Sequence, residues 1–278
     1  MIPAEFDYAR PSSVDEALAA LRDGGEDAKL LAGGHSLIPL MKLRLAAPEL
    51  LVDLRRVPGL SEVSRDNGTI RFGAMVRHHI VATGGFGLPS MAAATIADQQ
   101  VRNVGTIGGT LAHGDPASDM PAILLLHEGS VVVRGSGGER EIAAADLFED
   151  YLTTAIGEDE ILTEVRFPAL DGYGYGYHKF NRRQEDWAMV AVGAAVKLSG
   201  GVVEDVRIGL THMSSVPLRA TAAEEALRGK PATPENIAAA AELAAEGTEP
   251  PADLNASQEY KRHLARVLTR RALEDASE

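Results

Sequence analysis

The sequence predicts an α+β protein that is divided into more than one packed unit. Its 278 residues are enough for two or three hydrophobic cores. Short segments with strand-like alternation recur as far as Leu210, and segments with helical spacing lie between them. After Ala220 the chain becomes rich in Ala and Glu, a composition that favours helices alone.

Residues 1–56 are predicted to form a small first unit. The segment Ser13-Val14-Asp15-Glu16 matches a capping box, in which a Ser side chain and a Glu side chain satisfy free amides at a helix start. Apolar residues follow at helical spacing, and Gly24-Gly25 ends the helix. Two short strands are expected at residues 29–32 and 50–54.

Residues 57–170 are predicted to form a second unit that mixes strands and helices. Pro121 fits the first turn of a helix that begins near Asp119, because the amide missing from proline has no partner there. The expected strands are 69–73, 130–134 and 161–167, and the expected helices are 77–82, 89–97 and 119–127.

Residues 171–278 are predicted to form a third unit. Tyr and Gly alternate over residues 173–177, which places the aromatic rings on one face of an extended segment. Residues 188–198 fit a strand or a helix, and the Gly200-Gly201 turn before a second apolar segment favours a strand. The helices expected after this hairpin are 221–227, 234–245 and 257–273.

Two glycine-rich segments carry the strongest indication of function. They are Ala32-Gly33-Gly34-His35-Ser36 and Thr106-Ile107-Gly108-Gly109-Thr110. Consecutive amides without bulky side chains form a concave site for a phosphate, and the Ser36 hydroxyl is a further donor. Either segment alone also fits an ordinary tight turn, but two of them indicate a diphosphate held from both sides, as in a dinucleotide. Neither matches a Walker loop or a Rossmann fingerprint.

The composition disfavours several other functions. A formal net charge of −13 opposes nonspecific nucleic-acid binding, which needs a basic surface. Cysteine is absent, so this chain cannot form disulfides or bind iron–sulfur clusters through thiolates. The eight histidines lack metal-ligand spacing, and we find neither a membrane-spanning apolar run nor a secretory leader. We therefore expect a cytoplasmic protein without a metal site of its own.

A longer motif surrounds the second glycine segment. Residues 99–122 read QQVRNVGTIGGTLAHGDPASDMPA. Together with residues 32–37, this motif resembles the FAD-binding medium subunit of the molybdenum hydroxylases, the family that includes carbon monoxide, nicotine and xanthine dehydrogenases. The resemblance covers nearly the whole chain. Further matching segments are residues 42–44, 52–54, 179–183 and 253–257.

The resemblance implies a fold with an FAD-binding domain in two parts and a smaller α/β C-terminal domain. The FAD-binding domain would be of the PCMH type, which is similar to that of vanillyl-alcohol oxidase. Residues 1–56 would be its first subdomain and residues 57–170 its second. Residues 171–278 would form the C-terminal domain typical of molybdenum-hydroxylase flavoproteins.

The resemblance also implies a cofactor site. The two glycine segments would wrap the pyrophosphate of FAD, and Asp119 would meet ribityl or ribose hydroxyls. Ile161 or Leu162 would pack on the isoalloxazine ring. The full set of expected cofactor-binding residues is Ala32, Gly33, Gly34, His35, Ser36, Leu37, Thr106, Ile107, Gly108, Gly109, Thr110, His113, Asp119, Ile161, Leu162 and Lys179.

Lys179 and Thr110 differ from the other residues of this expected set. Lys179 would lie near the polar edge of the flavin, where a cation raises the reduction potential, although without the resemblance it reads as a solvated lysine. Thr110 stands where many relatives have Asn. The Thr110 hydroxyl can still donate a hydrogen bond, but the two-pronged geometry of the Asn amide is lost. No residue is required as a catalytic acid or base, because the expected role is electron transfer.

The resemblance further implies two partner subunits. A large subunit would carry the molybdopterin cofactor and oxidise the substrate, and a small subunit would carry two [2Fe–2S] clusters. Electrons would pass from the clusters to FAD on this chain and then to an external acceptor. The expected assembly is a dimer of heterotrimers. The substrate and the acceptor stay open, because neither is chosen by the motifs of this chain.

Two alternative functions follow from the same residues. The Gly-Gly-His turn could carry flavin covalently on His35, as in stand-alone oxidases of the vanillyl-alcohol-oxidase type. The chain could also be a scaffold that has lost FAD, although the intact glycine segments oppose this. Trp187 fits either a subunit contact or a core position.

Overall fold

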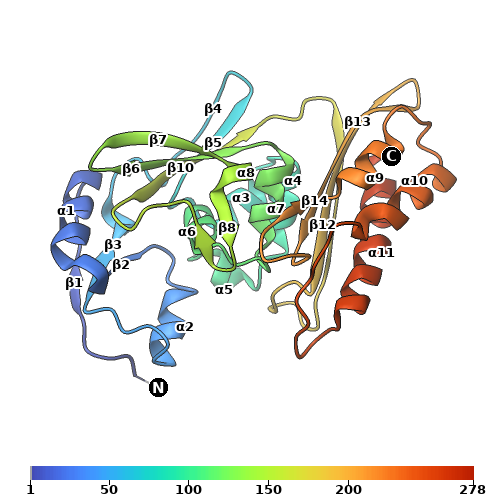
Figure 1. The fold of residues 1–278 in the computed structure, drawn as a ribbon. Helices are drawn as coiled ribbons and strands as arrows, with labels where there is room; N and C mark the ends of the chain where they lie inside the picture. The colour runs from blue at the N-terminus through green and yellow to red at the C-terminus, as the bar shows by residue number, and fades with distance from the viewer. Residues whose placement is uncertain (1) are drawn as a thin grey trace.

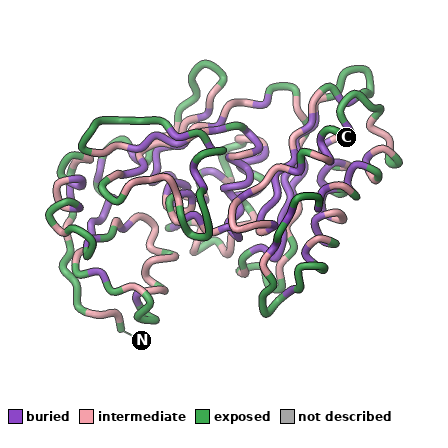
Figure 2. The backbone as a smooth tube through the Cα atoms, viewed as in Figure 1, coloured by how far each residue is buried: buried purple, intermediate pink, exposed green. Residues whose placement is uncertain are grey.

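The computed structural model describes residues 2–278 and confirms the predicted α+β class. The chain runs from an N-terminal group of short strands, through a central five-stranded sheet, to a C-terminal four-stranded sheet covered by helices (Figure 1). Buried backbone is concentrated in the strands and in the helices between the two larger sheets (Figure 2). No helix in the described part of the chain has both the length and the apolar character needed to cross a membrane.

The N-terminal segment forms a three-stranded parallel sheet in the order β1-β3-β2. Ser13 caps the first helix by accepting a hydrogen bond from the Glu16 amide at 3.1 Å. The Glu16 carboxylate binds the amide of Ser12 at 2.7 Å, one residue before the position that a capping box predicts. The elements are β1 (Asp7–Ala9), α1 (Val14–Gly24), β2 (Ala28–Leu31), α2 (Leu37–Lys42) and β3 (Leu50–Asp53).

The central segment is built on an antiparallel sheet in the order β4-β5-β10-β6-β7. Its strands are β4 (Val63–Asp66), β5 (Thr69–Gly73), β6 (Ser130–Gly135), β7 (Gly138–Ala143) and β10 (Ile161–Pro168), with a separate hairpin of β8 (Phe148–Asp150) and β9 (Thr153–Thr154). Its helices are α3 (His78–Thr83), α4 (Leu88–Ala94), α5 (Gln99–Arg102), α6 (Ile107–His113), α7 (Asp119–Leu126) and α8 (Ala144–Leu147).

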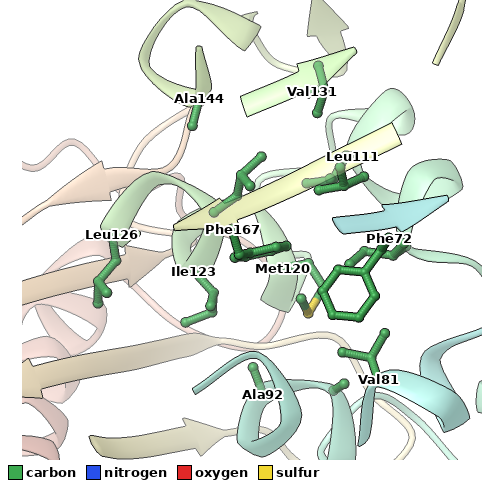
Figure 3. Close-up of a cluster of buried hydrophobic side chains, with 14 of the residues drawn as sticks. Phe72, Val81, Ala92, Leu111, Met120, Ile123, Leu126, Val131, Ala144 and Phe167 are labelled. Carbon is green, nitrogen blue, oxygen red and sulfur yellow. The ribbon is translucent and has the colours of Figure 1, made fainter. Parts of the chain in front are cut away.

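The main core lies between this sheet and the helices beside it. Phe72 of β5 and Phe167 of β10 meet edge to face, with ring centroids 5.8 Å apart. Met120 and Ile123 of α7 point toward the same group of side chains (Figure 3). All four side chains are fully buried, so the start of α7 is fixed against the sheet.

The C-terminal segment is an antiparallel sheet in the order β11-β12-β13-β14 with helices on its outer face (Figure 1). The predicted hairpin at Gly200-Gly201 is confirmed, because both segments beside it are strands. The elements are β11 (Tyr173–Phe180), β12 (Val190–Ser199), β13 (Val202–Thr211), β14 (Leu218–Arg219), α9 (Thr221–Leu227), α10 (Pro234–Ala241) and α11 (Gln258–Ala276).

The Tyr/Gly alternation of β11 has a packing reason. A Cβ on Gly174 or Gly176 would lie 2.2 Å or 2.1 Å from carbonyl oxygens of α11. The glycines therefore let the helix backbone approach the strand on one face. The tyrosines lie on the opposite face, where Tyr177 is buried against the main core.

Two local expectations differ from the structure. The second glycine segment is not a tight turn, because Thr106 is the N-cap of α6 and Ile107–His113 form the helix. Without the resemblance, Asp119 fits the N-cap of the helix that follows it. In the structure Ser118 occupies that position, and Asp119 is the first helical residue. The strands and α-helices that the sequence patterns did not predict are β1, α2, β4, α5, α6, β7, α8, β8, β9 and β14.

Candidate functional site

A cavity of about 530 Å³ lies where the three sheets approach one another. This volume falls in the range of small-molecule and cofactor sites. Both glycine segments line it, together with the start of α7, the start of β10 and the end of β11. The residues expected at a cofactor that line the cavity are Ala32, Gly33, Gly34, His35, Ser36, Leu37, Thr106, Gly108, Gly109, Thr110, His113, Asp119, Ile161, Leu162 and Lys179.

The two glycine segments touch each other in the cavity wall. A Cβ on Gly33 would lie 2.7 Å from the Cα of Gly105 and 2.7 Å from the carbonyl oxygen of Val104. A Cβ on Gly109 would lie 3.4 Å from that of Ala32. These glycines are therefore needed so that two backbone segments can approach, and not only to leave space for a ligand.

The amides of the first glycine segment are available to a ligand. Gly34 has a φ of +73°, a conformation that favours glycine. Within residues 2–278, the amides of Gly33, Gly34, His35 and Ser36 donate no hydrogen bond to another protein group. These four donors precede α2, so this segment has the free amides that its sequence predicts.

The second glycine segment differs from that expectation. The amide of Ile107 donates to the Val76 carbonyl at 2.9 Å, and the amide of Gly108 donates to the Ala74 carbonyl at 2.9 Å. A Cβ on Gly108 would lie 2.5 Å from that of Ala74. This segment is thus hydrogen-bonded to residues 74–76, which follow β5, and two of its amides already have acceptors within the protein.

Ile107 is the one expected residue that does not line the cavity. Its side chain is fully buried in the main core and holds α6 in place. Ile161 and Leu162, by contrast, are buried at the start of β10 and also form the apolar part of the cavity wall. His35 is exposed at the cavity rim.

Asp119 and Lys179 form a buried polar part of the wall, and Tyr177, which does not line the cavity, is hydrogen-bonded to Asp119. The Lys179 ammonium donates to Asp119 Oδ2 at 2.9 Å, and the Tyr177 hydroxyl donates to Asp119 Oδ1 at 2.6 Å. Burial, together with the adjacent Asp119 carboxylate, raises the pKa of Tyr177 well above its usual value. The tyrosine therefore stays protonated, and the carboxylate has a donor on each oxygen.

Motif reasoning did not identify Tyr177 as a partner of Asp119. Its only sequence signal was the Tyr/Gly alternation, which predicts a face of the strand but not its partner. Because Lys179 lies two residues later, both side chains leave β11 on the same face. The contact with Asp119 follows from the docking of α7 against this sheet.

His78 is a second residue that sequence reasoning missed. It lines the cavity beside Gly105, and burial lowers its pKa to about 4. The ring is therefore neutral at physiological pH. Its Nδ1 atom is buried and has no hydrogen-bond partner in the described chain.

Trp187 and its neighbours close another side of the cavity. Glu185, Asp186 and Trp187 all line it, and Trp187 is 53% exposed. These three residues lie in the connection between β11 and β12, outside both glycine segments. The remaining apolar lining residues come from several elements and are Leu30, Leu40, Leu54, Ala74, Met75, Ile96, Ala97, Val101 and Ala112.

Comparison with protein families divides the chain into two regions. Residues 4–170 match the FAD binding domain in molybdopterin dehydrogenase, and residues 175–276 match the CO dehydrogenase flavoprotein C-terminal domain. The cavity receives residues from both regions, because Lys179 and Trp187 lie in the second.

Similar proteins are medium chains of oxidoreductases. The carbon monoxide dehydrogenase medium chain of Hydrogenophaga pseudoflava is 41% identical, over 99% of this chain and 98% of the relative. The glyceraldehyde dehydrogenase medium chain of Sulfolobus acidocaldarius is 35% identical over the whole of both chains. A chain of quinoline 2-oxidoreductase from Pseudomonas putida 86 superposes with a TM-score of 0.96 and 34% identity, covering 100% of this chain and 98% of that one.

Proposed function

Because the chain belongs to the FAD-binding flavoprotein subunits of the molybdopterin dehydrogenases, we propose that its cavity holds FAD and that this subunit relays electrons within a larger oxidoreductase. When bound, the flavin supplies one- and two-electron redox chemistry. The observation that carries the proposal is that the amides of residues 33–36 donate no hydrogen bond within the described chain, while all four residues line a cavity of cofactor size.

The first glycine segment is suited to bind the diphosphate. Four adjacent donors compensate negative charge locally, which a protein with a net charge of −13 cannot do through its overall field. The second segment supports the first, since the contact of Gly33 with Gly105 holds the donors in place. We assign the direct diphosphate contacts to residues 33–36 and a more structural role to residues 106–109.

The rest of the cavity is suited to the flavin and its ribityl chain. Ile161 and Leu162 offer an apolar surface at the start of β10. Asp119 and Lys179 offer an acceptor and a donor in the same wall, and each already has a protein partner. A ligand hydroxyl or carbonyl can share these groups without leaving a charge unpaired.

The proposed electron route requires partner chains. This chain contains no cysteine and cannot hold a thiolate-bound iron–sulfur cluster. We propose that a small subunit with two [2Fe–2S] clusters delivers electrons to this site. A large molybdopterin subunit would oxidise the substrate, and the assembly would be a dimer of heterotrimers. Electrons would leave for an external acceptor.

Purification of the complex tests this proposal. The tagged chain, expressed in its natural host, should co-purify with two other subunits and with noncovalent FAD in a ratio near one per chain. Addition of the large subunit's substrate should bleach the flavin absorbance at about 450 nm. A purified complex that holds no flavin, or flavin that substrate never reduces, would contradict the proposed role.

A further inference from the structure

His212 occupies an unusual backbone position directly after β13. Its φ is +64°, in the left-handed region that non-glycine residues seldom adopt. Such a conformation persists where surrounding contacts hold the residue in place. The contacts of His212 therefore indicate what the conformation serves.

Those contacts connect two segments that line the cavity. The His212 amide donates to the Pro116 carbonyl at 2.9 Å, in the loop that leads to Asp119. The ring Nδ1 lies 2.7 Å from the carbonyl oxygen of Ala188, which follows Trp187. One residue thus holds the loop before α7 with its backbone and the β11–β12 connection with its ring.

The chemistry of these partners fixes the tautomer of the ring. A carbonyl only accepts hydrogen bonds, so the Nδ1 of His212 must carry the proton. Nε2 then presents a lone pair to the Lys261 ammonium, 3.3 Å away. Lys261 is fully buried and also donates to Asp253 Oδ2 at 2.7 Å, which keeps its charge paired.

The same region anchors the other end of the β11–β12 connection. Arg182 donates to the side-chain oxygen of Asn255 at 3.0 Å. The Asn255 amide in turn donates to Asp253 Oδ1 at 2.7 Å. The turn at residues 253–256 therefore secures residues 181–188 at both ends, through Arg182 and through the Lys261–His212 contact.

We propose that His212 is a positioning residue, whose ring fixes the Trp187 segment, residues 181–188, against the cavity. Binding of FAD there rests on the proposed function, whereas the position of the segment does not. His212 touches none of the expected ligand-binding groups directly. It acts by setting where the wall formed by Glu185, Asp186 and Trp187 lies.

The charges around His212 give the arrangement a pH dependence. Burial lowers the pKa of His212, the Ala188 carbonyl opposes this shift, and the Lys261 ammonium adds to it. Asp253 and Asp115 act in the opposite direction. Because the pKa lies below 6.5, the anchoring neutral ring is present at neutral pH. Below that pKa, a protonated Nε2 faces the Lys261 ammonium, and we expect the Trp187 segment to loosen.

The sole tryptophan of the chain provides the test, since Trp187 reports directly on this segment. His212→Gly removes the ring together with its Nδ1 donor and keeps a residue type that tolerates positive φ. At pH 8 this variant should show stronger acrylamide quenching of Trp187. It should also bind FAD about tenfold more weakly, the ratio that corresponds to one lost hydrogen bond to a buried group. His178→Asn, which changes a histidine of β11 paired with Asp275, should alter neither quantity.

Lys261→Met separates positioning from general destabilisation. Without the ammonium, a protonated His212 no longer faces a like charge at Nε2, so the increase in Trp187 quenching that the wild type shows at low pH should be lost. Unchanged quenching in His212→Gly, or a wild-type acid transition in Lys261→Met, would overturn the assignment. If the wild type binds no FAD, the proposed function fails, while the quenching experiments still decide the role of His212.

Discussion

Lys179 and Asp119 form a buried ion pair in the wall of the cavity, with 2.9 Å between Nζ and Oδ2. Their side chains are only 5% and 4% exposed. The pair makes this part of the wall neutral, so Lys179 is not the free cation that its position in the sequence suggests. Any influence of Lys179 on a bound flavin is therefore balanced by Asp119.

Removal of Lys179 should change the wall from neutral to negative. In Lys179→Met, the buried Asp119 carboxylate keeps only the Tyr177 donor, which should lower the free energy of unfolding by about 3 kcal/mol. The added negative charge should also lower the flavin reduction potential, because reduction places further negative charge nearby. Urea unfolding and spectroelectrochemistry measure the two effects.

A double variant provides the control for this prediction. Asp119→Asn combined with Lys179→Met restores a neutral wall, so the potential should return toward that of the wild type. A potential that is the same in all three proteins would show that this pair does not face the flavin.

Larger residues at Gly33 or Gly108 should separate the segments that form the cavity. A valine at Gly33 would collide with the backbone of residues 104–105, and a valine at Gly108 would collide with Ala74. Both variants should lose bound FAD, measured by flavin absorbance per chain, and should unfold at lower urea concentration. Gly137→Val is the matched control, because a Cβ there meets open space. Retention of stoichiometric flavin in Gly33→Val would refute the expectation.

The buried histidines should make the protein sensitive to mild acid. Burial lowers the pKa of His127 and of His78 to about 4, below the ordinary value of 6.5. The unfolded chain therefore binds protons that the folded chain does not, and stability present above pH 6.5 is lost as the pH falls toward 4. Each histidine should account for about 2 kcal/mol between pH 7 and pH 5.

Replacement of one histidine tests the direction and the magnitude of this pH-dependent change in the free energy of unfolding. His127→Gln should reduce the pH dependence of the free energy of unfolding by that amount, measured by urea unfolding at pH 7 and pH 5. The partly exposed His79 serves as a control, and His79→Gln should keep the wild-type dependence. Equal dependence in all three proteins would contradict the expected contribution of burial.

The linkage between FAD and the protein is open to a direct chemical test. His35 is exposed at the rim of the cavity, next to amides that we assign to diphosphate binding. We expect noncovalent flavin, so acid precipitation should leave the yellow colour in the supernatant. Flavin in the pellet that disappears in His35→Ala would instead support covalent attachment at His35.

Sequence patterns predicted the longer elements well, because these elements carry a clear period. The helix at α1, the strands β5 and β10, and the hairpin of β12 and β13 lie within a few residues of their predicted positions. Short elements such as β9 and β14 were missed, since two residues contain no periodicity. Their formation depends on neighbouring strands that are distant in the sequence.

The candidate site, too, could be predicted only where the sequence carries a local signal. The glycine segments were recognisable because free amides and close backbone contacts both require glycine. Tyr177, His78 and His212 carry no such local signal, and their roles arise from contacts between elements far apart in the chain. Sequence also could not show that the amides of Ile107 and Gly108 are used within the protein, because their acceptors lie on Val76 and Ala74.

The bare face of β11 has a consequence for engineering this chain. Without side chains at Gly174 and Gly176, the strand that carries Tyr177 and Lys179 rests directly on the main chain of the last helix near Ala272 and Ala276. A truncation that removes these two alanines would leave the strand unsupported, far from any ligand contact. A fusion partner should therefore be joined through a flexible spacer beyond that helix, so that its movements are not transmitted to the candidate site.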